Sequence, residues 1–123
     1  MSTADAPATE AAVVRNTETG SGGAPRFFLL RLVPPRATFP DDMSAAENAA
    51  MAQHFAYWSE KARERTAVVY GPVRDSQAVW GLAVIEVADE ESAREVVAAD
   101  PIIRSGLGFS YDTLPMLNAV VRG

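Results

Sequence analysis

Residues 26–33 read Arg-Phe-Phe-Leu-Leu-Arg-Leu-Val and are followed at once by Pro34 and Pro35. Aromatic and aliphatic residues at this density, closed by proline, are typical of a β-strand, in which alternate residues face opposite sides. One side is wholly apolar and consists of Phe28, Leu30 and Leu32. The other side carries an arginine and consists of Phe27, Leu29, Arg31 and Val33. Both faces of the sheet should therefore be covered, and the face with Arg31 is expected to form a cleft or an interface.

The residues that follow predict two helices and three to four further strands. A helix is expected over residues 44–65, because Ser44 and Glu47 have the spacing of a capping box. Residues 67–70, closed by Gly71-Pro72, and residues 79–87 predict a hairpin. A second helix begins at Asp89 and must end by Asp100, since Pro101 follows. Further strands are expected over residues 109–114 and 116–122.

This order of elements predicts an α+β fold of the ferredoxin-like split βαβ type, with an antiparallel sheet and two main helices on one face. Two helices cover only one face of such a sheet, whereas the first strand would leave the other face apolar as well. The simplest cover is a second copy related by a two-fold axis. We therefore expect a homodimer through the open sheet face, which makes a dimeric α/β barrel.

The N-terminal side has a different composition. Residues 1–25 are rich in Ala, Thr, Ser, Gly and Glu, which predicts a disordered N-terminal arm and leaves residues 26–123 as one domain. Asp5, Glu10 and Arg15 interrupt every apolar stretch of the arm, so it lacks the pattern of a secretory signal. A cytoplasmic location is the default expectation.

Composition also excludes several classes of function. The net charge of -5 argues against a nucleic-acid surface, and no apolar run is long enough for a membrane-spanning helix. The absence of cysteine excludes disulfides and thiolate chemistry. His54 is the lone histidine, so a metal site built on several imidazoles cannot come from one chain. We expect no metal and no cofactor.

The first helix carries the main candidate site. His54, Tyr57, Trp58 and Lys61 follow helical spacing and share one stripe. Such a stripe is more often core packing than chemistry, and a lone histidine on it is more often structural. A catalytic role requires a carboxylate that orients the imidazole, and Asp100 is the candidate. An aspartate before proline is also a routine turn former.

Three other positions have two interpretations each. Arg31 could bind an anionic ligand or form a salt bridge with Glu86 on the neighbouring strand, and the salt bridge is slightly favoured. The step Gly71-Pro72 is most simply a strand end, although a glycine also lets a ligand approach the backbone, and the same applies to Gly81. Residues 105–108, Ser-Gly-Leu-Gly, lack the context of a phosphate loop or a nucleophile elbow.

Taken in order, these residues resemble the YCII-related domain (YciI-like) family. The matching features are His54 with Tyr57-Trp58, then Gly71-Pro72, Trp80-Gly81-Leu82, Ala99-Asp100-Pro101 and Leu114-Pro115-Met116. The resemblance implies a ferredoxin-like homodimer with a cleft at its interface and a catalytic pair at His54 and Asp100. Met116 departs from the tryptophan that many relatives carry after the proline.

Two functions fit these residues. The first is a small cofactor-free enzyme in which His54, oriented by Asp100, moves a proton on a cyclic or aromatic small molecule. Arg31, Tyr57 and Trp58, with the Gly71-Pro72 step, would bind that substrate in the interface cleft. Related proteins imply dehydrochlorinase-like or isomerase-like chemistry. The alternative is a non-catalytic small-molecule-binding or interaction module with the same dimeric fold.

Overall fold

The computed structural model describes residues 13–16 and 26–123. In the described part of the chain the elements are β1 (Val13–Asn16), β2 (Arg26–Val33), α2 (Ala45–Arg63), β3 (Ala67–Arg74), β4 (Val79–Val87), α3 (Glu90–Ala99), α4 (Pro101–Arg104), β5 (Ser110–Pro115) and β6 (Asn118–Val121). The capping box of Ser44 and Glu47 starts α2 as predicted. None of the helices in these ranges is long and apolar enough to cross a membrane.

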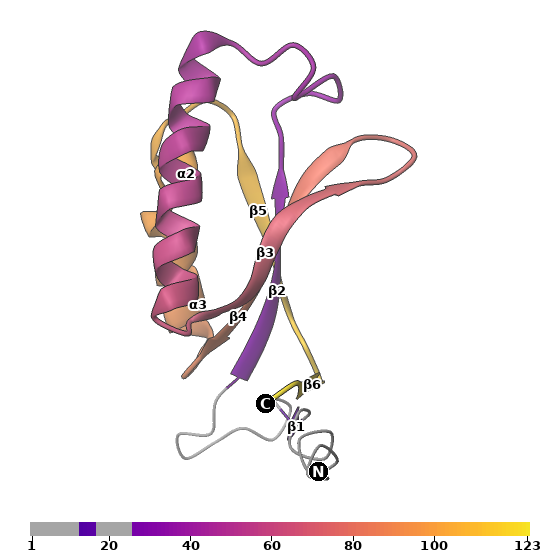
Figure 1. Ribbon diagram of the computed structural model, residues 1–123, viewed down its shortest axis with the longest axis vertical. Coiled ribbons are helices and arrows are strands. Elements are labelled where there is room, and N and C mark those ends of the chain that lie inside the picture. The colour runs from indigo at the N-terminus through magenta and orange to yellow at the C-terminus, as the bar shows by residue number, and fades with distance from the viewer. Residues whose placement is uncertain (1–12, 17–25) are drawn as a thin grey trace, which may run out of the picture.

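Four strands form the main sheet in the order β3-β4-β2-β5, and all neighbouring strands are antiparallel. The long helix α2 and the shorter α3 pack on the same side of this sheet (Figure 1). Strand β2 lies between β4 and β5, as its apolar character predicts. This arrangement confirms the α+β fold and is the topology of a ferredoxin-like split βαβ domain.

The core lies between α2, α3 and the inner face of the sheet, which is the face that the helices cover. Leu30 on β2 and Ile85 on β4 are both fully buried there. The buried members of this cluster are Phe28, Leu30, Trp58, Ala67, Ala83, Ile85 and Ala93. Burying one large aliphatic side chain stabilises a fold by about 1.5–3 kcal/mol, so this cluster holds α2 against the sheet.

Three details differ from the sequence prediction. Strand β3 continues through Gly71 and Pro72 to Arg74 instead of stopping at the glycine. Proline is tolerated there because β3 is an edge strand, where one row of backbone N–H groups has no ladder partner. The last strand, β6, pairs with β1 and not with the main sheet. Residues 13–16 therefore form a strand within the segment predicted to be disordered, and the rest of residues 1–25 lies outside the described residues.

The outer face, which is the side of the sheet away from the helices, carries an apolar row. Val69, Val84, Leu29 and Leu114 are in register across all four strands, one residue from each. Val69 is 48% exposed and Leu114 is 47% exposed, while the two central residues are half-buried. The prediction that apolar residues occupy the open face thus holds for this row.

Candidate functional site

A cavity of about 400 Å³ lies between α2, the inner face of the sheet and the loop of residues 34–43. Its walls are mainly apolar; they include Leu32, Phe39, Met43, Met51, Phe55, Trp58 and Phe109. Asn48 and Phe55 are exposed residues of α2 and mark its rim, whereas His54 lies deeper and is buried. Residues of a single chain line the cavity. Its size is suited to a small organic molecule.

His54 and Asp100, which are separated by 46 residues, meet beside this cavity. The Nδ1 atom of His54 lies 2.9 Å from Oδ2 and 3.1 Å from Oδ1 of Asp100. The aspartate is fully buried at the junction between α3 and α4, where its side chain also accepts from the backbone N–H of Ile102 and caps α4. Pro101 is the first residue of α4, so the Asp-Pro step that ends α3 also positions the carboxylate.

Two more side chains donate to the same carboxylate. Trp58 Nε1 lies 2.8 Å and the Tyr111 hydroxyl 2.6 Å from Asp100 Oδ2. Burial by itself would raise the pKa of Asp100, but the hydrogen bonds from His54, Tyr111 and the N–H of Ile102 outweigh it and lower this pKa below its ordinary value of 3.8. Asp100 is therefore ionised at neutral pH and can only accept hydrogen bonds, so Nδ1 of His54 carries the proton.

The orientation of the imidazole follows from this contact. With Nδ1 directed at Asp100, Nε2 is the ring atom left for a ligand, because the described residues bond the ring through Nδ1. Among those same residues, no group of three or more His, Asp and Glu side chains is placed to hold a metal ion. The arrangement can therefore accept a proton at Nε2 and stabilise the resulting imidazolium through Asp100.

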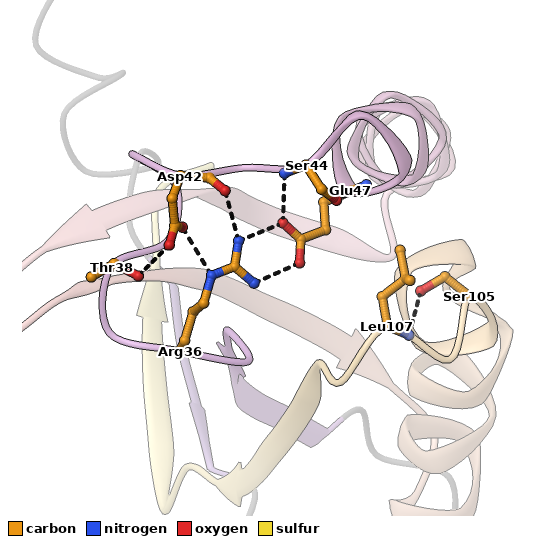
Figure 2. Close-up of polar contacts among 7 residues, drawn as sticks. All are labelled: Arg36, Thr38, Asp42, Ser44, Glu47, Ser105 and Leu107. Carbon is orange, nitrogen blue, oxygen red and sulfur yellow. Dashed lines mark hydrogen bonds and ion pairs between the residues drawn. The ribbon is translucent and has the colours of Figure 1, made fainter.

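An ion-paired clasp, made of Arg36, Asp42 and Glu47, holds the loop before α2 (Figure 2). This loop forms one wall of the cavity. Both terminal nitrogens of Arg36 bind the carboxylate of Glu47 at 2.8 Å, and its Nε binds Asp42 at 2.9 Å. The hydrogen bonds from Arg36 and from the N–H of Ser44 lower the pKa of Glu47 to about 2. The clasp joins the loop to the first turn of α2, next to Phe39, Pro40 and Met43 in the cavity wall.

Some of the predicted binding residues do line the cavity. Trp58, Gly71 and Pro72 all contribute to its wall. A Cβ atom on Gly71 would meet nothing within 4 Å, so the space beside it is open. At Gly81 a Cβ atom would lie 3.1 Å from Cβ of Leu32, and both of these residues also line the cavity. Glycine at position 81 thus permits the close approach of β4 and β2.

Tyr57 is outside the cavity, contrary to prediction. Its hydroxyl donates to the carbonyl oxygen of Val96 on α3 at 2.7 Å, and the ammonium of Lys61 lies 5.1 Å from its ring centroid. The predicted stripe on α2 spans a wide arc of the helix surface. His54 and Trp58 therefore face the cavity, whereas Tyr57 faces α3.

Arg31 also lies away from the cavity, because strand alternation puts it on the outer face while Leu30 and Leu32 face inward. The predicted salt bridge to Glu86 is wrong. The register places Arg31 opposite Asp112 of β5, with which it pairs at 3.2 Å, and places Glu86 opposite Phe27. The guanidinium of Arg31 also lies 5.6 Å from the ring centroid of Trp80.

Tyr111 is the main site residue that sequence reasoning missed. It lies on β5 and lines the cavity as well as binding Asp100. No local motif marks it; the available signal was that a buried aspartate needs several donors. Burial, followed by the charge of Asp100 and the hydrogen bond to it, raises the pKa of Tyr111 well above its ordinary value of 10.0.

This shift predicts how stability changes at alkaline pH. A tyrosine whose pKa is raised in the folded state stabilises the fold below the unfolded pKa, and this stabilisation is lost as pH rises above it. We expect the free energy of unfolding to fall above about pH 10, and to fall more steeply in the natural protein than in Tyr111→Phe. The two slopes should differ by up to about 1.4 kcal/mol per pH unit. Urea unfolding across this range measures both slopes. Equal pH dependence of the unfolding free energy in the two proteins would contradict a raised pKa of Tyr111.

Comparison with known proteins places the chain in a family. A family model described as the YCII-related domain matches residues 30–117. No curated protein matches the chain. Among solved structures, the uncharacterized protein TM1266 from Thermotoga maritima is similar, with 11% sequence identity and a TM-score of 0.43 over 75% of this chain and 98% of that chain. Since the family match covers well over half of its residues, the chain belongs to the YCII-related domain family.

Proposed function

We propose that the protein is a cofactor-free acid–base enzyme that moves a proton on a cyclic or aromatic small molecule bound in the cavity. The observation that carries this proposal is the buried contact of 2.9 Å between His54 Nδ1 and Asp100, made beside a cavity of about 400 Å³ that His54 lines. An imidazole fixed by a carboxylate is a common general base.

In the proposed reaction, Nε2 of His54 takes a proton from a C–H or O–H group of the substrate. The electron pair of that bond stays on the substrate, and the imidazolium that forms is stabilised by ionised Asp100. Return of the proton to the same or another atom of the substrate completes the cycle. Because Asp100 is held by Trp58, Tyr111 and the N–H of Ile102, the imidazole keeps its orientation throughout.

Deuterium exchange tests this proposal and does not require that the product be identified. A panel of uncharged cyclic and aromatic carbonyl compounds is incubated with the protein in D₂O, and loss of a C–H signal is followed by ¹H NMR. For any compound that exchanges, His54→Gln is expected to slow the exchange by about 10²–10⁴-fold. The matched control is Tyr57→Phe on the same helix, which removes a hydroxyl outside the cavity and should retain the rate.

The same experiment separates catalysis from simple binding. Equal exchange rates in the natural protein and His54→Gln would exclude His54 as the base. A compound that binds in the cavity and is returned without exchange in either protein supports the alternative of a non-catalytic binding module.

We further propose that two copies of the chain pair through the outer face. The support is the apolar row of Val69, Val84, Leu29 and Leu114, whose two edge members are about half exposed. A row of this kind can pack against its own two-fold copy, with the same residues on both sides.

Sedimentation of charge variants tests the pairing. The natural protein is expected to sediment at twice the mass of the chain at micromolar concentration, and Leu114→Glu should shift it toward the monomer by burying a charge in the interface. Leu117→Glu is the matched control, since Leu117 is 62% exposed and lies beyond the end of β5. A monomeric natural protein would refute the proposed dimer.

A further inference from the structure

We propose that the cavity selects an uncharged, mainly apolar molecule with one hydrogen-bond donor and excludes carboxylates and phosphates. This inference rests on the proposed function, because it concerns the same cavity. It specifies the charge and polarity of the ligand, which proton transfer alone leaves open.

The first argument is the absence of a counter-ion. None of the described residues that line the cavity is Lys, Arg, Asp or Glu. Two arginines of the adjoining strand and loop are committed elsewhere: Arg31 lies on the outer face with Asp112, and Arg36 is held by Asp42 and Glu47. A carboxylate bound in this cavity would lose its hydration without gaining a cation, which is costly.

The second argument is the charge behind His54. Asp100 is fully buried and ionised, and its negative charge lies directly across the imidazole from the cavity. A ligand anion would be repelled by it through a medium that screens poorly. An uncharged ligand meets neither this repulsion nor the loss of a strongly bound water shell.

The third argument is that the lining aromatic side chains have already used their polar atoms. Trp58 and Tyr111 donate to Asp100, and the hydroxyl of Tyr70 bonds that of Ser59. Their rings therefore present apolar faces and edges to a ligand. A ligand needs few polar groups to match these walls.

One polar atom in the depth of the cavity remains for the ligand, and its hydrogen-bonding role is defined. The proton on Nδ1 of His54 faces Asp100, so Nε2 of the neutral ring is an acceptor. It is matched by a single donor on the ligand. Asn48, which is exposed at the rim, is the other uncommitted polar side chain among the described lining residues.

Three probes with one ring system test the inference by calorimetric titration near neutral pH. 2-Naphthol is uncharged and carries a donor, 2-methoxynaphthalene is uncharged without a donor, and 2-naphthoate is an anion. We expect 2-naphthol to bind at least about tenfold more tightly than 2-naphthoate, with 2-methoxynaphthalene between them. Shifts of the Trp58 indole N–H signal in NMR spectra locate the bound probe.

A charge-introducing variant provides the reciprocal test. Asn48→Lys places a cation at the rim on an exposed helix position, where folding tolerates the change. It should raise the affinity for 2-naphthoate relative to 2-naphthol by about tenfold. Gln53→Lys is the matched control, because Gln53 is exposed on the same helix but does not line the cavity.

Several results would overturn the inference. These are equal or tighter binding of 2-naphthoate by the natural protein, no binding of any probe, and equal gains of 2-naphthoate affinity in both lysine variants. Failure of the proposed function looks different: proton exchange would be unaffected in His54→Gln while the order of probe affinities stayed as expected.

Discussion

Replacing Asp100 by alanine is expected to lower the free energy of unfolding by about 3–5 kcal/mol. The carboxylate is fully buried and accepts hydrogen bonds from four donors, in His54, Trp58, Tyr111 and the backbone of Ile102. Alanine removes the acceptor of the donors in His54, Tyr111 and Ile102 and the N-cap of α4, while Trp58 Nε1 keeps its bond to the Tyr111 hydroxyl at 3.1 Å. The cost of each unsatisfied group adds to that of the cavity created.

Urea unfolding near pH 7 measures this loss against a matched control. Asp89→Ala removes another aspartate N-cap, that of α3, whose carboxylate bonds the N–H of Ser92 at an exposed site. Asp89→Ala should lose much less unfolding free energy than Asp100→Ala, because water can replace the acceptor at this exposed site. Similar losses in the two variants would mean that the buried network around Asp100 contributes little.

Trp58→Ala is expected to cost about 3–5 kcal/mol of unfolding free energy. The indole is 1% exposed and packs in the core cluster with Phe28, Leu30 and Ile85. It also donates to Asp100, so its removal both opens a void in the core and withdraws one of the hydrogen bonds that the buried carboxylate accepts.

Trp80→Ala is the natural control for Trp58. Both tryptophans line the cavity and both donate to an aspartate, but Trp80 is only half-buried and its partner Asp75 is exposed. The expected loss is about 1 kcal/mol or less. Equal losses in the two variants would show that the tryptophan of α2 is not a core residue. Both variants are compared by urea denaturation at one pH.

Much of the fold could be predicted from particular residues. The apolar run of β2, the capping box at Ser44 and the stop at Pro101 each act locally, and so they define elements correctly. The pairing of β1 with β6 could not be predicted, because it joins residues more than a hundred positions apart that carry no turn signal. The course of β3 through Pro72 was missed for a related reason, since its position at a sheet edge depends on the whole topology.

The candidate site was predictable only in part. His54 and Asp100 were paired through the resemblance to a family, and the structure brings them into contact. Tyr57 was assigned to the ligand because it shares a helical stripe with His54, but its side chain turns toward α3. Arg31 was assigned because its sheet face was expected to form a cleft. It does lie on that outer face, where it pairs with Asp112 away from the cavity. The loop of residues 34–43 and Tyr111 of β5 also line the cavity. They could not be predicted there, because only the tertiary packing brings these segments next to α2.

The clasp of Arg36 has a kinetic consequence. Its partners, Asp42 and Glu47, are 6 and 11 residues away in the sequence, so closing these loops costs little chain entropy. Loops of this length close on a timescale of about 10–100 ns, far faster than long-range strands pair. We therefore expect the ion pairs of the clasp to break and re-form locally while the four-stranded sheet stays intact and Phe39 keeps the loop anchored in its buried cluster with Leu32 and Phe109.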